Sequence, residues 1–168
     1  NRIDNAGLTK KHPSEDFPLE DWNQIIQVNL TGVFLFAQKA GKVMLDQGQG
    51  SIINISSVAS KQAITSSIAY GASKGGVNML TKTFASEWAN RGVRVNGIAP
   101  AYIETPLVKA IKDHREDFSN DILKRTPMNR MGEPREIVGA VIFLASDASS
   151  YVTGETIFVD GGWTSIGL

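Results

Sequence analysis

The sequence predicts an α/β fold in which helices cover both faces of a parallel sheet. Short apolar runs of strand length alternate with longer stretches whose apolar residues recur every three or four positions. Glycine or proline stands at the junctions between them. This order of strands and helices implies right-handed crossovers and parallel strands. At this length we expect one domain, residues 1–168.

The first helical pattern lies between Pro18 and Gln47. Eight apolar residues form its stripe, and these are Trp22, Ile25, Ile26, Val33, Phe34, Ala37, Met44 and Leu45. The segment from Gln47 to Gly50 ends this helix. Residues 51–56 then predict a short, largely apolar strand of the kind that is buried in a parallel sheet.

The second helical pattern covers residues 69–90. Its apolar stripe consists of Val77, Leu80, Phe84 and Trp88. A glycine follows the helix and favours its termination there. Residues 93–98 predict another buried strand, which Pro100 closes.

Residues 101–131 carry mixed charge and show no single period. They predict a loop with short helices near residues 107–112 and 118–125, and one interpretation of this loop is a lid. Pro134 suits a first helical turn and predicts a helix that ends near Asp147.

The last strand is predicted at residues 156–159. It is apolar and β-branched, and the Asp-Gly-Gly segment at 160–162 ends it. The strands at 51–56, 93–98 and 156–159 should therefore lie in one sheet.

Composition excludes several classes of protein. Seventeen basic residues balance seventeen acidic ones, so no long-range field favours nucleic acid. No apolar run approaches the roughly 18 residues that cross a bilayer, so we expect a soluble protein without a membrane partner. The absence of cysteine is compatible with the cytoplasm. His12 and His114 lack the spacing of metal ligands, so no metal is expected.

Tyr70 and Lys74 are the central candidates for chemistry. They are four residues apart at the start of a predicted helix, so their side chains lie on one face. An ammonium beside a phenol favours the phenolate and lets the pair exchange a proton nearer to neutral pH. Such a pair also arises by chance, and then it is only a surface contact.

Two further polar residues occupy informative positions. Ser57 follows the strand at 51–56, where the carboxyl edge of a parallel sheet binds ligands, although serine there also serves as a cap or turn residue. Asn29 lies on the apolar stripe of the first helix, and a buried amide needs partners. It therefore either braces a helix or holds a water molecule.

Six segments resemble motifs of the short-chain dehydrogenase/reductase family. They are Asn-Ala-Gly at 5–7, Val-Asn-Leu at 28–30, Ile-Asn-Ile-Ser-Ser at 53–57, Tyr-Gly-Ala-Ser-Lys at 70–74, Arg-Val-Asn-Gly-Ile-Ala-Pro at 94–100 and Val-Asp-Gly-Gly at 159–162. The resemblance implies a Rossmann-like, doubly wound parallel sheet. It also implies hydride transfer between a nicotinamide dinucleotide, NAD or NADP, and a carbonyl or secondary alcohol.

The resemblance assigns a role to each candidate. Tyr70 would be the acid/base, and Ser57 would orient and polarise the carbonyl. Lys74 would bind the nicotinamide ribose and lower the pKa of Tyr70. Asn29 would hold a water that links Lys74 to solvent. The cofactor side would consist of Asn5, Ala6, Gly7, Pro100, Ile103 and Thr105, together with Tyr70 and Lys74.

Three features depart from the family pattern. Asp4 replaces the usual second asparagine, and Ala101 replaces a glycine, which restricts the backbone beside the nicotinamide carboxamide. The Gly-rich turn that approaches the pyrophosphate is absent, because Gly48 and Gly50 do not fit it. The resemblance thus covers the C-terminal part of the fold and places Asn1 inside its fourth strand. We expect residues 1–168 alone neither to bind cofactor tightly nor to stay monomeric. A scaffold relative without cofactor is the alternative.

Within the family, the chain is most similar to sugar-acid and polyol members such as gluconate 5-dehydrogenase. The segments that carry this similarity are 11–13, 17–22, 124–127 and 143–150. Reductases of 3-oxoacyl thioesters are the alternative. Four basic residues offer charge to a substrate carboxylate, namely Lys109, Lys112, Arg115 and Arg125, although exposed bases are also simply solvated.

The resemblance also implies a homotetramer that pairs through the two long helices. Phe84 and Trp88 would extend the apolar patch of that interface, unless they pack only inside the subunit.

Overall fold

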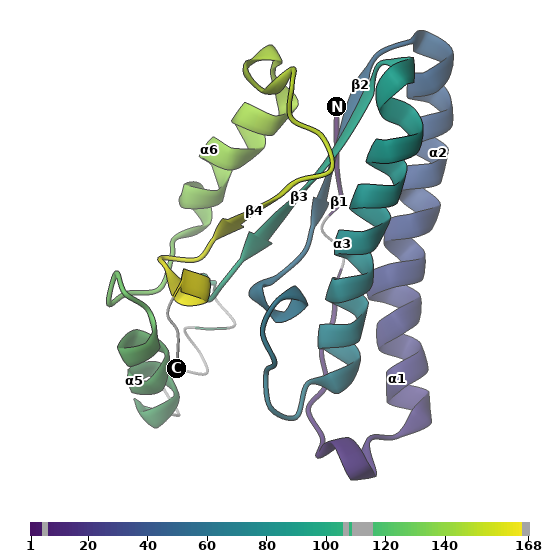
Figure 1. Ribbon diagram of the computed structural model, residues 1–168. Coiled ribbons are helices and arrows are strands. Elements are labelled where there is room, and N and C mark those ends of the chain that lie inside the picture. The colour runs from purple at the N-terminus through teal and green to yellow at the C-terminus, as the bar shows by residue number, and fades with distance from the viewer. Residues whose placement is uncertain (5–6, 106–107, 109–115, 166–168) are drawn as a thin grey trace.

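Four parallel strands form the sheet in the order β1-β2-β3-β4, as Figure 1 shows. The computed structural model describes residues 1–4, 7–105, 108 and 116–165. The strands are β1 (Arg2–Asp4), β2 (Gly50–Ile55), β3 (Val93–Pro100) and β4 (Thr156–Val159). Ile52 of β2 lies opposite Val95 of β3, and Ala99 of β3 lies opposite Phe158 of β4. The predicted α/β class and the predicted strands are confirmed.

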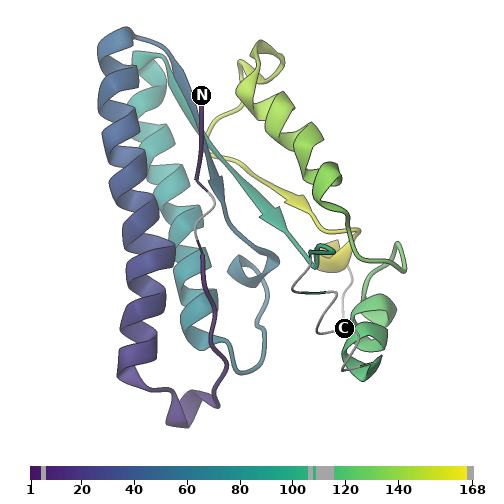
Figure 2. The same ribbon diagram turned by 180° about the vertical axis from the view of Figure 1, so that it is seen from behind.

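Helices cover both faces of the sheet (Figure 2). On one face lie α2 (Gly32–Gln47) and α3 (Ile68–Trp88), and on the other lies α6 (Pro134–Ala145). Successive residues of β2 point to opposite faces. Ile52 therefore packs against α2 and α3, whereas Ile53 packs with Leu144 of α6. These two apolar clusters are the core of the Rossmann-like sheet that the sequence predicts.

The long first helix is interrupted by a π-helical turn. Helix α1 (Leu19–Ile26) passes into the π turn Gln27–Thr31, which continues directly into α2. The predicted long helix between Pro18 and Gln47 is confirmed as one continuous helical run, and the π turn lies within it. A π turn admits one extra residue per turn and often occurs at functional sites. Asn29 lies in this turn and is completely buried.

Glycines end the two long helices where the backbone turns left-handed. Gly48 caps α2 at φ 68°, and Gly92 has φ 82° after the short 3-10 helix Ala89–Arg91. A Cβ at Gly92 would lie 2.0 Å from the carbonyl oxygen of Gly48, so a larger residue does not fit. Gly48 is thus a helix cap and belongs to no phosphate-binding turn.

Phe84 and Trp88 pack inside the subunit. Each is 7% exposed, and their rings stack at 4.3 Å between centroids. Gly41 of α2 makes room for Trp88, because a Cβ there would lie 2.5 Å from the indole ring. The expectation that these aromatics extend an apolar surface patch is therefore wrong.

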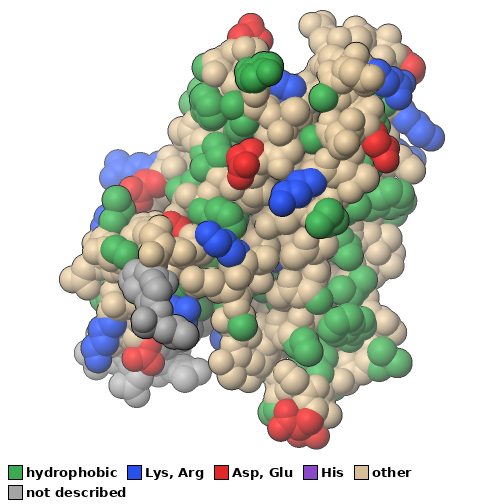
Figure 3. Space-filling model, viewed as in Figure 1, with side chains coloured by type: hydrophobic (Ala, Val, Ile, Leu, Met, Phe, Trp, Pro, Cys, Tyr) green, Lys and Arg blue, Asp and Glu red, His purple; other side chains and the backbone are tan. Residues whose placement is uncertain are grey.

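A different apolar surface lies over α2 and α3. Hydrophobic side chains gather on this side of the molecule in Figure 3. Met79 of α3 is an exposed member of this surface, while Phe36 of α2 is exposed beneath the guanidinium of Arg2. A shallow groove runs between the two helices beside Leu30, Phe34 and Leu80.

The C-terminal part contains α5 (Glu116–Arg125) and a 3-10 turn at Trp163–Ser165. Helix α5 begins two residues before its predicted start, while the predicted helix at 107–112 lies outside the described residues, apart from Val108. Ile122 of α5 packs with Val58, Met131 and Trp163 in a third apolar cluster. No helix in the described part of the chain is long and apolar enough to cross a membrane.

Candidate active site

The candidate residues meet at the carboxyl ends of β2 and β3. Ser57 follows β2, while Tyr70 and Lys74 belong to the first turns of α3. Ser57 and Tyr70 line a cavity of about 350 Å³, a size typical of small-molecule sites. The segment after β3 supplies another wall through Ala101, Ile103 and Thr105. With Thr9 and Lys11 included, the structure thus brings residues from four separate segments to one cavity.

Ser57 and Tyr70 line the same cavity, and the Ser57 hydroxyl lies close enough to Tyr70 to lower the pKa of its phenol. The Ser57 hydroxyl oxygen also accepts a hydrogen bond of 3.2 Å from the backbone N–H of Ala59. With one lone pair engaged by a backbone donor, the hydroxyl proton of Ser57 is available for an acceptor. Ser57 can therefore donate to a carbonyl oxygen or to a tyrosinate.

Burial raises the pKa of Tyr70 above its ordinary value of 10.0, and the Ser57 hydroxyl acts in the opposite direction. Desolvation disfavours the charged phenolate, and here it outweighs the effect of Ser57. The resemblance implies that Lys74 lowers the pKa of Tyr70. In this structure the pKa of Tyr70 is instead raised. Tyr70 is a protonated phenol at neutral pH and is equipped to donate a proton.

Lys74 lies on the same face of α3 as Tyr70. Its ammonium is 5.8 Å from the centroid of the Tyr70 ring, and the residue is only 5% exposed. The Nζ atom donates a hydrogen bond of 2.9 Å to the carbonyl oxygen of Ile55, at the end of β2. This contact joins α3 to the sheet and holds the ammonium beside the cavity.

Asn29 braces the chain that runs toward the site. Its Oδ1 accepts from the backbone N–H of Leu8 at 2.8 Å, and its Nδ2 donates to the carbonyl of Leu8 at 2.8 Å. The Nδ2 atom also donates to the hydroxyl of Ser73 at 3.3 Å, and this hydroxyl donates to the carbonyl of Tyr70 at 2.7 Å. These contacts brace α3 and the backbone at Leu8.

Gly7 lies between these polar groups. A Cβ built on it would be 3.7 Å from Asn29 Oδ1 and 3.8 Å from Lys74 Nζ. The other residues of the Asn-Ala-Gly motif, Asn5 and Ala6, lie outside the described residues.

The segment after β3 is held by hydrogen bonds to the residues before α6. Gly132 donates from its N–H to the carbonyl of Tyr102 at 3.0 Å, and its own carbonyl accepts from Glu104 N–H at 2.8 Å. The Thr105 hydroxyl accepts from the N–H of Val108 at 3.3 Å. Among the described non-glycine residues, positive φ is confined to Ser66 and Asn129, so Ala101 tolerates its methyl group without backbone strain.

The predicted basic residues do not reach the cavity in the part of the chain that the structure describes. Arg125 donates to Gln62 Oε1 at 3.3 Å and lies 4.8 Å above the Trp163 ring, outside the cavity lining. The other three, Lys109, Lys112 and Arg115, lie outside the described residues.

Sequence reasoning missed a chain of hydrogen bonds behind Ser57. The hydroxyl of Ser60 donates to the Ser57 carbonyl at 2.6 Å and accepts from Asn78 Nδ2 at 2.8 Å. The hydroxyl of Thr156 on β4 donates to Asn78 Oδ1 at 3.4 Å. Only the fold brings these residues together, and they hold the turn that carries Ser57.

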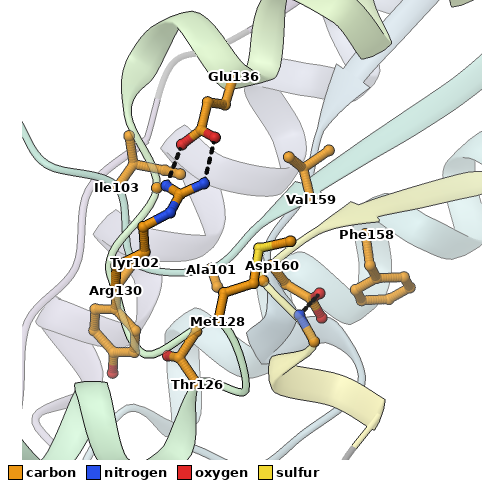
Figure 4. A pocket seen from close by; sticks show the side chains of 13 residues that line it. Ala101, Tyr102, Ile103, Thr126, Met128, Arg130, Glu136, Phe158, Val159 and Asp160 are labelled. Carbon is orange, nitrogen blue, oxygen red and sulfur yellow. Dashed lines mark hydrogen bonds and ion pairs between the residues drawn. The ribbon is translucent and has the colours of Figure 1, made fainter.

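A second cavity, of about 400 Å³, lies on the α6 side of the segment after β3 (Figure 4). Arg130 reaches across it to Glu136 with two hydrogen bonds of 2.7 Å. This pairing, together with the Glu133 N–H, lowers the pKa of Glu136 to about 2. Asp160 accepts from the backbone N–H groups of Gly162 and Thr164, both at 2.9 Å. These carboxylates are engaged in holding the loops around α6.

Comparison with known proteins decides the family. A family model described as Enoyl-(Acyl carrier protein) reductase matches residues 2–164. The chain belongs to the short-chain dehydrogenase/reductase family. It is 48% identical over 163 residues to 2-dehydro-3-deoxy-D-gluconate 5-dehydrogenase of Bacillus subtilis, covering 97% of this chain and 64% of the relative. It is 43% identical over 160 residues to 5-keto-D-gluconate 5-reductase of Escherichia coli, covering 95% of this chain and 63% of the relative.

A solved structure supports the same assignment. The chain matches a gluconate 5-dehydrogenase from Burkholderia cenocepacia, in complex with NADP and tartrate, with a TM-score of 0.94 and 46% identity. The match covers 98% of this chain and 64% of that structure. This short-chain dehydrogenase/reductase chain thus spans less than two thirds of the length of these relatives.

Proposed function

We propose that the protein is an oxidoreductase that transfers a hydride between a nicotinamide dinucleotide, NAD or NADP, and a carbonyl or secondary alcohol. The observation that carries this proposal is the meeting of Ser57 and Tyr70 on the wall of one cavity, with the Lys74 ammonium 5.8 Å from the centroid of the Tyr70 ring. The relatives, which are named as dehydrogenases and reductases, support it.

In this proposal each site residue either transfers or stabilises a proton or holds another group in position. Tyr70, a phenol that is protonated at neutral pH, gives its proton to the oxygen of a carbonyl substrate and takes it back in the reverse direction. Ser57 donates its one hydroxyl hydrogen bond to the same oxygen and so polarises the carbonyl. Lys74 places a positive charge beside the tyrosinate that forms. Asn29 fixes the Leu8 backbone, and its water-holding role in proton relay is part of this proposal.

The described residues fit a nicotinamide dinucleotide. Gly7 leaves room beside the Lys74 ammonium, and Ile103 and Thr105 line the same cavity as Tyr70. When bound, the cofactor supplies or accepts the hydride. The residues proposed to hold it are Asn5, Ala6, Gly7, Tyr70, Lys74, Pro100, Ile103 and Thr105.

A sugar acid or polyol is the proposed substrate class. The gluconate names of the Bacillus and Escherichia relatives support it, as does the tartrate in the Burkholderia complex. Turnover of 3-oxoacyl thioesters without any turnover of sugar acids or polyols would overturn this choice of substrate.

The variant Tyr70→Phe in the full-length protein tests the reaction. It removes the proton donor, so we expect turnover to fall by roughly 10²- to 10⁴-fold while the protein still binds cofactor. Tyr151→Phe is the matched control, since this tyrosine is fully exposed on the surface. Equal rates for Tyr70→Phe and the wild type would refute the assigned role. A wild type without turnover or cofactor binding would favour the scaffold alternative.

We further propose a homotetramer that pairs through α2 and α3. The exposed Met79 and the apolar groove beside Leu30 and Leu80 support an interface with a second copy of the chain. Light scattering of the full-length protein tests this, and a monomer at micromolar concentration would contradict it.

We also propose that the protein acts in the cytoplasm. The absence of cysteine from the sequence is compatible with a reducing compartment. Cell fractionation with an antibody to the protein tests this location, and recovery from an extracytoplasmic fraction would contradict it.

A further inference from the structure

Residues 8–12 form a strap along one wall of the active-site cavity, and their side chains alternate in direction. Thr9 and Lys11 line the cavity together with Ser57 and Tyr70. Lys10 and His12 instead contact Asp21 of α1, at 2.6 Å and 2.8 Å. This alternation is that of an extended chain, in which successive side chains point to opposite sides.

The strap is anchored along its length. Asn29 holds the backbone of Leu8 through two hydrogen bonds of 2.8 Å. At the other end, the backbone N–H of His12 donates to the carbonyl of Ser66 at 3.1 Å. The carboxylate of Asp21 pairs with Lys10 and His12, and these pairings lower its pKa below the ordinary value. Anchors on both sides of Lys11 keep its position in the cavity wall defined.

The polar side chains of the cavity lining are mostly uncharged, which sets Lys11 apart from the other lining residues. The polar lining residues besides Lys11 are uncharged hydroxyl-bearing side chains, and these are Thr9, Ser57, Ser67, Tyr70, Tyr102 and Thr105. Hydroxyls suit a substrate rich in alcohol groups but do not distinguish an acid from a neutral polyol. Among the described lining residues, Lys11 is the one that carries a charge. An ammonium forms charge-assisted hydrogen bonds with carboxylates.

We propose that Lys11 binds a carboxylate of the substrate and so makes the enzyme select acids over neutral polyols. This inference rests on the proposed oxidoreductase function and names the substrate class of the same cavity. Lys11 acts in recognition, while Ser57 and Tyr70 act at the oxygen that gains or loses a proton. Arg125, the basic residue that lies outside the cavity lining, has no such role.

A pair of substrates that differ at one carbon tests the proposal. Gluconate carries a carboxylate where glucitol carries a hydroxymethyl group, so the ratio of their kcat/KM values reports recognition of the charge. We expect Lys11→Met in the full-length enzyme to lower this ratio by about tenfold or more, the effect of losing one charge-assisted hydrogen bond. Lys11→Arg, which keeps the charge, should restore most of the ratio.

Lys10→Met is the matched control. It removes the same charge from the adjacent residue, whose ammonium faces Asp21 and not the cavity. The ratio of kcat/KM for gluconate to that for glucitol should stay within about twofold of the wild-type ratio. The reason is that removing a charge from an exposed ion pair changes energies only slightly. A similar fall of the ratio in both variants would show a general charge effect and overturn the proposal. An equal loss on both substrates in Lys11→Met would do the same.

A binding measurement separates this proposal from the proposed reaction. Gluconate is titrated into the full-length wild type and into Lys11→Met by calorimetry, with glucitol as the neutral ligand. Gluconate binding that depends on Lys11, in a protein without turnover, would support the proposal while refuting the oxidoreductase function. Turnover with no Lys11-dependent preference would refute the proposal alone. Neither turnover nor gluconate binding would overturn both.

Discussion

Asn29 holds Leu8 through a pair of hydrogen bonds, each 2.8 Å long, in which the side-chain amide matches both polar groups of one backbone residue. The two residues are 21 positions apart in the sequence. Asn29 also donates to the hydroxyl of Ser73, which in turn donates to the carbonyl of Tyr70. One side-chain amide therefore links the backbone at Leu8 to α3, the helix that carries Tyr70.

Replacing Asn29 by alanine should destabilise the protein. The change leaves the N–H and carbonyl of the half-buried Leu8 without their partners, and the roughly 1–3 kcal/mol that a fully buried unpaired group costs is the upper value for each. Urea unfolding measures the loss. Asn23→Ala, at an exposed position of α1, is the control and should change stability by less than about 0.5 kcal/mol. Equal stability of the two variants would contradict the brace.

Tyr70 should make stability fall at alkaline pH. Its folded pKa lies above the ordinary value of 10.0 because burial disfavours the phenolate. The resulting stabilisation is fully present below about pH 10, the pKa of the unfolded chain, and is lost as the pH rises through the higher folded pKa. Denaturation between pH 9 and pH 11 should therefore show a smaller alkaline loss for Tyr70→Phe than for the wild type. Tyr151→Phe, at a fully exposed position, should follow the wild type. Parallel curves for all three proteins would contradict the assignment.

Glu136 should protect the start of α6 down to strongly acidic pH. Its pKa is lowered to about 2, first by the hydrogen bond with Arg130 and then by that with the Glu133 N–H. For a carboxylate with a depressed pKa, stabilisation is present above the ordinary value of 4.5 and is lost as the pH falls through about 2. NMR titration of the Glu136 carboxyl measures this value. Arg130→Met should move it toward 4.5, and an unchanged titration would refute the pairing.

Two glycine-to-alanine changes should have opposite effects. Gly41→Ala places a methyl group 2.5 Å from the Trp88 ring, and overpacking of this kind costs roughly 1–3 kcal/mol. Gly139→Ala, in the middle of α6, meets no atom within 4 Å and should stabilise by about 0.5–1 kcal/mol through helix propensity. Thermal unfolding compares the two. Similar shifts for both would contradict the close packing of α2 against Trp88.

Local patterns were sufficient for most elements of the fold. The strand at Thr156–Val159 and the helix that begins at Pro134 have the bounds expected from β-branched runs and from the position of a proline. The four-residue spacing of Tyr70 and Lys74 correctly placed both on one face of α3. These features depend on residues close together in the chain, so the sequence contains their determinants.

Contacts between distant segments could not be predicted in the same way. An apolar stripe shows that Phe84 and Trp88 are candidates for burial, but the fit of Trp88 against Gly41 decides that they face the core and not a partner. Likewise, no local pattern indicates that Glu136 and Arg130 pair, or that Asn29 lies in a π turn. Each of these outcomes follows from how two elements pack.

The sequence by itself determined the α/β class, the order of its elements and the candidate set Asn29, Ser57, Tyr70 and Lys74. Only the tertiary structure decided that burial raises the pKa of Tyr70 and that Lys11, rather than Arg125, lines the cavity. The physical reason is that the solvation of a side chain and the direction in which it points are set by the packing of the whole chain. Periodicity specifies which face a residue occupies on its own element, whereas charge and pKa depend on what the other elements place beside it.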